Sequence, residues 1–290
     1  MKKLLIFGSS GMAGHVVYDI LSKRMDIDVQ NVSYRTKINE KTILLDISNL
    51  KLVEDIIKKV RPDIIINCVG VLIRGSKNDP ANAILINSYF PHFLSKIAHE
   101  NNGVLYHLST DCVFSGYKGD YTTHDTLDSR DHYGLTKALG EVNNQYDLTI
   151  RTSIIGPEIK LMGEGLFHWF LSQTGVVSGY TESLWNGVTT LQLAKFIEQA
   201  VDNNLHGLIQ YSSTNKISKH DLLLLIKEIW ERDDIKLNAI SGKHIDKSLV
   251  PNYPEFIHQV PTYHRMLEEL KGYMSLQPVR YSYYLKKGNR

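Results

Sequence analysis

The stretch LLIFGSSGMAG at residues 4–14 decides the fold, because it joins a short apolar run to a glycine-rich loop. The apolar run predicts a buried strand, and Met12–Ser22 continues with the apolar spacing of a helix. Gly8, Gly11 and Gly14 follow a GxxGxxG spacing, one residue longer than the common dinucleotide-binding fingerprint. Glycine permits a tight turn and close approach to a pyrophosphate, and a helix N-terminus attracts anions. The stretch therefore predicts a strand, loop and helix that cradle the phosphates of a dinucleotide.

The same alternation of strand and helix patterns continues through the first half of the chain. Strand patterns occupy Asp28–Ser33, Ile43–Leu45, Asp63–Asn67, Val104–Leu108 and Leu148–Arg151, and helical patterns occupy Leu50–Val60, Ala81–Glu100 and Tyr133–Asn143. Such an order is typical of right-handed βαβ units. We predict an α/β fold, a Rossmann-type doubly wound parallel sheet, which binds ligands beyond the carboxyl ends of its strands.

After Gly156-Pro157 the pattern becomes irregular and rich in glycine, which predicts a boundary. We expect residues 1–157 to form a dinucleotide-binding Rossmann domain, completed by parts of 188–230. Residues 158–290 should form mainly a smaller C-terminal lobe that binds substrate. Further elements are expected as helices at Leu191–Val201 and Ser218–Trp230, the second with Ser218 as N-cap, and as a strand at Leu208–Tyr211.

Composition excludes several classes of protein. The chain has 33 basic and 31 acidic residues, so a net charge of +2 implies neither a nucleic-acid nor a membrane partner. Its two cysteines, Cys68 and Cys112, lack metal-ligand spacing, so we expect no bound metal and no disulfide framework. No apolar stretch approaches the ~20 residues of a membrane-spanning helix. We expect a cytoplasmic protein, with a homodimer left open.

The residues after the second predicted strand bear on the choice of cofactor. A free ribose 2′-hydroxyl is usually met there by Asp or Glu, but this chain has Arg35. A guanidinium matches a phosphate, so Arg35, supported by Ser33 or Lys37, favours NADP(H) over NAD(H). A solvated basic loop is the alternative. Asp46 is placed to meet the adenine, although it could equally cap the end of its strand.

Tyr133 and Lys137 form the predicted chemical centre. A tyrosine can donate a proton to the alkoxide that forms when a carbonyl is reduced, and an ammonium four residues later on a helix can tune it. The spacing alone is weak evidence, because Tyr283 and Lys287 repeat it. Thr110 supplies the context, since it follows a predicted strand and its hydroxyl could orient the carbonyl.

These motifs together resemble those of the dTDP-4-dehydrorhamnose reductase family. The resemblance rests on the glycine loop, on Asn67–Gly70, on Ser109–Gly116 and on Tyr133–Glu141, and it covers residues 1–157. It implies transfer of hydride from NADPH to C4 of a 4-keto-6-deoxy sugar linked to a nucleoside diphosphate. By the same resemblance, Thr110, Tyr133 and Lys137 would be the catalytic residues.

The resemblance also implies contacts with cofactor and substrate. The cofactor would meet Gly8, Ser10, Gly11, Met12, Gly14, Arg35, Asp46, Ile47, Cys68, Val69, Gly70, Tyr133 and Lys137. The nucleotide-sugar substrate would meet Val71, Asn87, Trp185 and Arg265.

Cys112 departs from the family, whose members commonly carry tyrosine there. GDP-L-fucose synthase, a related epimerase-reductase, has cysteine at the corresponding step, where a thiol and a histidine exchange protons beside the keto group. Cys112 is therefore a further catalytic candidate, and His168 is a candidate partner for it. Both could instead be packing residues. Two alternatives remain: a nucleotide-sugar epimerase or epimerase-reductase using Cys112, and a non-catalytic NADP-binding subunit similar to the regulatory subunit of methionine adenosyltransferase.

Overall fold

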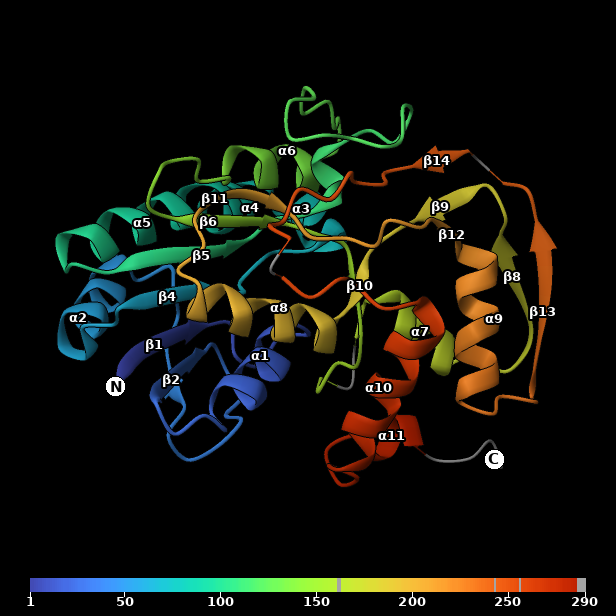
Figure 1. The fold of residues 1–290 in the computed structure, drawn as a ribbon, viewed down its shortest axis with the longest axis horizontal. Helices are drawn as coiled ribbons and strands as arrows, with labels where there is room; N and C mark the ends of the chain where they lie inside the picture. The colour runs from blue at the N-terminus through green and yellow to red at the C-terminus, as the bar shows by residue number, and fades with distance from the viewer. Residues whose placement is uncertain (161–162, 243, 256, 286–290) are drawn as a thin grey trace.

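A seven-stranded parallel sheet forms the centre of the computed structural model, which describes residues 1–160, 163–242, 244–255 and 257–285 (Figure 1). The strand order is β11-β6-β5-β4-β1-β2-β3, and every neighbouring pair is parallel. The strands are β1 Lys2–Phe7, β2 Ile27–Ser33, β3 Ile43–Leu44, β4 Ile64–Asn67, β5 Val104–Leu108, β6 Leu148–Arg151 and β11 Gly207–Gln210. The predicted doubly wound α/β fold is confirmed.

Helices cover both faces of this sheet because its strands are apolar on both sides. In β1, Leu4 and Ile6 enter one buried cluster, and Leu5 and Phe7 enter another on the opposite face. The first cluster includes residues of α1 (Gly14–Leu21) and α8 (Thr190–Asp202). The second includes residues of α2 (Leu50–Val60) and α5 (Phe90–Glu100). The sheet is thus the middle of three layers.

Two predicted helices differ from those observed. The expected helix Ala81–Glu100 is divided into α4 (Pro80–Ala83), a π-helical segment η1 (Ile84–Tyr89) and α5, with a short α3 (Ile73–Asn78) before it. The helix expected to reach Asn143 is α6 (His132–Leu139), which ends at Gly140. At Gly140 a Cβ would lie 1.8 Å from the Asn87 carbonyl oxygen, so the chain meets η1 there and turns away.

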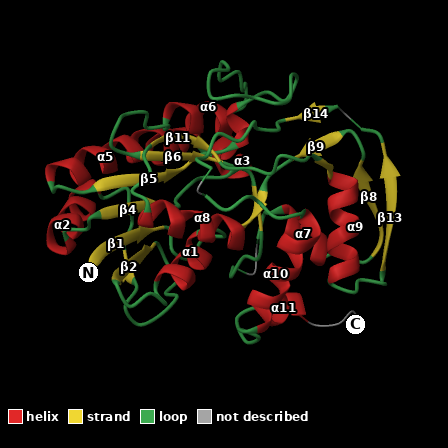
Figure 2. Cartoon of the chain, in the orientation of Figure 1, coloured by secondary structure: helices red, strands yellow, loops and turns green. Residues whose placement is uncertain are grey.

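The later part of the chain builds smaller sheets beside the main one, at the right of the view in Figures 1 and 2. Their strands are β7 Ile154–Ile155, β8 Gly175–Tyr180, β9 Ser183–Trp185, β10 Val188–Thr189, β12 Ile217–Ser218, β13 Ile235–Ile240 and β14 Ile245–Asp246. The helices here are α7 Leu166–Leu171, α9 Lys219–Ile229, α10 Tyr263–Ser275 and α11 Ser282–Leu285. The Ser218 hydroxyl caps α9 by accepting from the Asp221 N–H at 3.0 Å, as predicted.

The chain crosses between the two parts more than once. Both α8 and β11 follow residue 157, but α8 packs on α1 and β11 extends the main sheet beside β6. None of the described helices is long and apolar enough to cross a membrane.

Candidate active site

The glycine loop between β1 and α1 is closed against the loop that follows β4. Gly8 has a φ of +82°, and a Cβ there would lie 2.9 Å from the carbonyl carbon of Cys68. A Cβ on Gly14 would lie 2.2 Å from the Gly8 carbonyl oxygen. These positions accept only glycine without a shift of backbone. The loop leads directly into α1, so its geometry fits the phosphate cradle of a dinucleotide.

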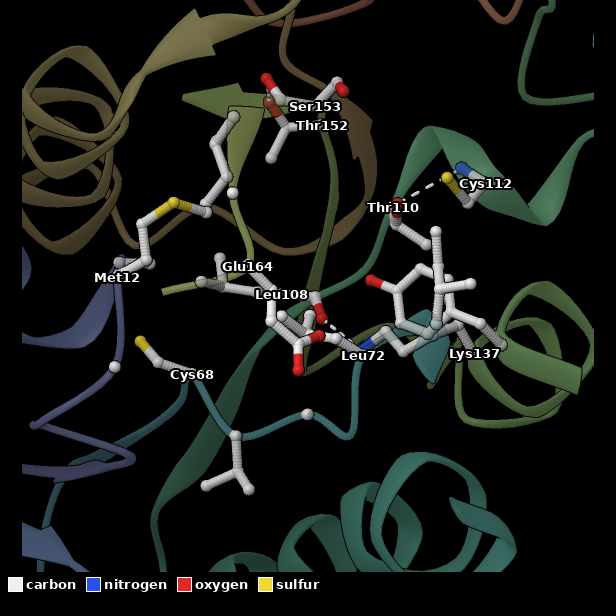
Figure 3. Close-up of a pocket in the computed structure, with 18 of the residues that line it drawn as sticks. Met12, Cys68, Leu72, Leu108, Thr110, Cys112, Lys137, Thr152, Ser153 and Glu164 are labelled. Carbon is white, nitrogen blue, oxygen red and sulfur yellow. Dashed lines mark hydrogen bonds between the residues drawn. The ribbon is translucent and has the colours of Figure 1, made fainter. Parts of the chain in front are cut away.

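A cavity of about 400 Å³ opens beside this loop, at the carboxyl ends of β1, β4 and β5 (Figure 3). It brings together ten residues predicted for the site: Ser10, Gly11, Met12, Cys68, Val69, Gly70, Thr110, Cys112, Tyr133 and Lys137. Met12 and Cys68 lie on one side of the view, and Thr110, Cys112 and Lys137 lie on the other. The glycine loop and the Tyr–Lys helix therefore face one space, although they are more than a hundred residues apart in sequence.

Thr110 is held by the turn that follows β5. Its Oγ1 accepts from the Cys112 N–H at 3.1 Å and donates to Asp111 Oδ1 at 3.1 Å, so it caps a short 3-10 turn, η2 (Asp111–Val113). Tyr133 lines the same cavity as Thr110. Tyr133 is placed by α6, whose N-cap Asp131 accepts from the Gly134 N–H at 2.9 Å. Burial raises the pKa of Tyr133, so its hydroxyl keeps its proton at neutral pH.

Lys137 extends from α6 to the end of β5. Its Nζ donates to the Leu108 carbonyl at 2.6 Å, drawn as a dashed line in Figure 3, and lies 3.4 Å from His107 Nε2. Burial lowers the pKa of Lys137 to about 8, with Glu141 and Cys68 acting in the opposite direction. The lysine therefore changes protonation close to neutral pH.

Cys112 lines the cavity, but the structure does not bring His168 into the lining with it. Burial raises the pKa of the Cys112 thiol to about 12, and Asp111 adds to the effect. His168 is buried on α7, with Nδ1 2.6 Å from the Tyr284 hydroxyl and its ring stacked on Tyr283. The packing interpretation of His168 therefore agrees with its contacts. Lys287, which repeats the lysine spacing after Tyr283, lies outside the described residues.

The residues predicted for the adenosine end lie at the ends of β2 and β3. The exposed Arg35 guanidinium stacks on the Tyr34 ring at 4.4 Å and donates to its hydroxyl at 3.1 Å. The Ser48 N–H, 3.0 Å from Asp46, holds the pKa of that carboxyl below its usual range, with Tyr34 and Arg35 adding to the effect. Ile47 packs against the buried cluster around α2 and α5. Tyr34, Arg35 and Asp46 are therefore neighbours. The contacts of Arg35, Asp46 and Ile47 with a cofactor stay a prediction.

The four residues predicted for the substrate are spread more widely. Asn87 is buried in η1 and holds both polar groups of the Val71 backbone, accepting from its N–H at 2.8 Å and donating to its carbonyl at 2.9 Å. Trp185 donates through Nε1 to the hydroxyl of Ser153, a cavity residue, at 2.9 Å. Arg265 is exposed on α10 and pairs with Glu269 at 2.8 Å. None of the four is in the cavity lining, so their roles stay predictions.

Sequence reasoning missed the wall of the cavity that comes from residues after β6. This wall contains Thr152, Ser153, Ile154, Glu158, Lys160, Glu164 and Gly165. Within the described ranges, no group of three or more His, Cys, Asp or Glu residues could hold a metal ion.

Comparison with known proteins identifies the family. The family model described as the RmlD substrate binding domain matches residues 1–251. The chain belongs to this family. Its members are NAD(P)-dependent nucleotide-sugar oxidoreductases with a Rossmann-like fold.

Curated relatives match about half of this chain. A dTDP-4-dehydrorhamnose reductase of Aggregatibacter actinomycetemcomitans is 30% identical over 143 residues, which are 49% of this chain and 46% of that protein. The reductase of Salmonella typhimurium is 30% identical over 141 residues, 48% of this chain and 45% of the relative. The chain thus spans about half the length of the curated relatives it matches.

Solved structures extend the likeness over most of the chain. A hypothetical dTDP-4-dehydrorhamnose reductase from Sulfolobus tokodaii has a TM-score of 0.74 and 27% identity, covering 86% of this chain and 92% of that one. A Bacillus anthracis dTDP-4-dehydrorhamnose reductase in complex with NADP has a TM-score of 0.79 at 20% identity, covering 94% of this chain and 100% of the other. At that identity the second likeness supports the fold alone.

Proposed function

We propose that this member of the RmlD family uses NADPH to reduce the 4-keto group of a 4-keto-6-deoxy sugar linked to a nucleoside diphosphate. One observation carries the proposal: Thr110, Tyr133 and Lys137 line a single cavity together with the glycine loop. Carbonyl reduction needs a proton donor and a hydride donor that both reach the same carbonyl group. This cavity offers room for both.

Each residue of the set would have a separate task. The nicotinamide, when bound, supplies the hydride. Thr110 would hold the keto oxygen through its hydroxyl, so that the carbonyl points towards Tyr133. Tyr133 would then donate its proton as negative charge develops on that oxygen. The Lys137 ammonium would stabilise the tyrosinate that is left, because opposite charges attract strongly in a buried site.

Two features support NADP(H) as the cofactor. The glycine loop has no room for side chains at Gly8 and Gly14, as close backbone approach to a pyrophosphate requires. Arg35 is exposed just beyond the carboxyl end of β2, where a guanidinium could pair with a 2′-phosphate. NADP is also bound in the Bacillus anthracis structure.

The chemistry of Cys112 favours simple reduction over epimerisation. Its pKa of about 12 leaves the thiol protonated at neutral pH, and a protonated thiol cannot remove a proton from carbon. We expect no solvent deuterium at C3 or C5 of the product formed in heavy water. Deuterium at either carbon would instead support the epimerase-reductase alternative.

The decisive experiment follows NADPH oxidation by the purified chain. The substrates are 4-keto-6-deoxy sugars linked to different nucleoside diphosphates, and mass spectrometry of the product should show a gain of two hydrogens. Binding of NADPH is measured separately by fluorescence. Protein that binds NADPH but oxidises it with none of these substrates would contradict the proposal. If such protein also co-purified with a larger enzyme, the regulatory-subunit alternative would gain support.

A further inference from the structure

His107 is a buried imidazole that the proposed reaction does not use, although it contacts the lysine of the site. It lies on β5 with no exposed surface, and its Nε2 is 3.4 Å from Lys137 Nζ. Its other ring nitrogen, Nδ1, is 3.1 Å from the Asn67 side-chain nitrogen. The three side chains form a row from β4 through β5 to α6.

The Asn67 amide decides which nitrogen of His107 carries the proton. Asn67 Oδ1 accepts from the Val69 N–H at 3.1 Å, so its Nδ2 faces His107 and donates to it. Because Nδ1 accepts this bond, it carries no proton. Burial holds the pKa of His107 well below its usual range, so the ring is neutral. Its single proton therefore lies on Nε2, facing Lys137.

This tautomer treats the two protonation states of Lys137 unequally. The Lys137 ammonium has only N–H donors, so it cannot accept a hydrogen bond from the His107 Nε2–H. The neutral amine has a lone pair and can accept this bond. The Leu108 carbonyl, 2.6 Å from Nζ, can accept in either state. His107 therefore favours the amine, and it acts in the same direction as burial, which lowers the pKa of Lys137 to about 8.

The ionisable groups that act on Lys137 are Glu141 and Cys68, Tyr133 lines the same cavity, and His92 acts on His107. Glu141 raises the pKa of Lys137, but Arg151 occupies both of its carboxylate oxygens at 2.7 Å. Burial raises the pKa of the Cys68 thiol to about 12, so this group is neutral at neutral pH. Burial likewise keeps the Tyr133 hydroxyl neutral. None of these groups therefore places an unpaired negative charge that would outweigh the effect of His107 on the pKa of Lys137.

We propose that His107, held in its Nε2–H tautomer by Asn67, is a positioning residue that prepares Lys137 to release its ammonium proton during turnover. The inference rests on the proposed reduction, in which Tyr133 gives its proton to the alkoxide and becomes a tyrosinate. The Lys137 ammonium then returns a proton to Tyr133, and the resulting amine accepts from the His107 N–H. As product leaves, the Lys137 amine takes up one proton from bulk solvent, which is the proton that the reduction consumes, so each cycle ends where it began.

The test titrates Lys137 itself, in protein without substrate. Lysine labelled with ¹³C at Cε is followed by NMR, and the resonance is assigned by its loss in Lys137→Arg. Asn67→Asp keeps the shape of the side chain but offers a carboxylate that accepts a hydrogen bond from Nδ1–H of His107. The proton of His107 then lies on Nδ1, so the Nε2 that faces Lys137 carries none. We expect this variant to raise the Lys137 midpoint by about one pH unit or more. His107→Leu removes the donor without adding charge, so it should raise the midpoint by less.

The matched control is His99→Gln on α5, where His99 pairs with Asp147 and not with the lysine. It should leave the Lys137 midpoint in place. Spectra of ¹⁵N-labelled histidine should show the His107 proton on Nε2 in the parent chain and on Nδ1 in Asn67→Asp. An Nδ1–H form in the parent, or a midpoint that neither variant moves, overturns the proposal. Failure of the proposed reduction would appear separately, as absent NADPH oxidation in protein whose titrations behave as expected.

Discussion

At the scale of single residues, Tyr133 and Tyr283 show how little a spacing means without its surroundings. Both precede a lysine by four positions, but Tyr133 lines the cavity together with Thr110 and Lys137, whereas Tyr283 stacks on His168. We expect Tyr133→Phe to lower kcat by about 10²–10⁴-fold, because it removes the proton donor. NADPH affinity should change little. Tyr283→Phe is the matched control, and steady-state kinetics of both variants provide the measurement. Near-normal turnover by Tyr133→Phe would remove Tyr133 from the mechanism.

Arg35 tests the choice of cofactor at the same scale. Its side chain is exposed and contacts Tyr34, so its removal leaves the buried core intact. We expect Arg35→Ala to weaken NADPH binding about 10-fold, which corresponds to ~1.4 kcal/mol, while NADH binding stays unchanged. Fluorescence titration with each nucleotide measures this. Lys41→Ala, an exposed cation on the same loop, is the control. Equal losses for NADPH and NADH would show that Arg35 does not read the 2′-phosphate.

At the scale of elements, the junction of β1, the glycine loop and α1 depends on backbone packing. In Gly14→Ala the new Cβ would lie 2.2 Å from the Gly8 carbonyl oxygen, so the loop must move. We expect a loss of about 1–3 kcal/mol in the free energy of unfolding, together with weaker NADPH binding. Gly272→Ala on α10 is the opposite case, because nothing lies within 4 Å of its new Cβ. It should stabilise the protein by about 0.5–1 kcal/mol in urea unfolding. Equal stabilities of the two variants would contradict the packing argument.

At the scale of the whole molecule, the C-terminal helices dock on the helix that begins at the cofactor loop. Asp19 of α1 accepts from Tyr273 at 2.6 Å, from Gln277 at 3.1 Å and from Arg280 at 2.5 Å. We expect Asp19→Ala to cost about 2–3 kcal/mol of unfolding free energy, because three donors lose a charged acceptor. Asp55→Ala, which breaks an exposed pair with Lys51, should cost no more than ~0.5 kcal/mol. A cost for Asp19→Ala as small as that for Asp55→Ala would show that this docking contributes little.

The sequence by itself determined the elements whose signals are local. The glycine loop at Gly8–Gly14 and the repeated apolar runs predict a doubly wound sheet. Both signals are local, because the spacing of apolar residues and the conformational freedom of glycine each depend on only a few neighbouring residues. The helix Ala81–Glu100 was predicted as one piece, but buried Asn87 bonds to the Val71 backbone, and the helix widens into a π-turn around it. No local sequence pattern predicts the hydrogen bonds between Asn87 and Val71.

Only the tertiary structure decided which side chains meet. The Asn67–His107–Lys137 row joins residues 40 and 30 positions apart, and the cavity wall from Thr152 to Gly165 comes from a segment whose irregular pattern predicted little. Such contacts form because parallel strands end at one edge of the sheet, whatever their separation along the chain. Burial at that edge then sets the proton affinities of Tyr133, Lys137 and Cys112, which depend on surroundings that the linear sequence does not display.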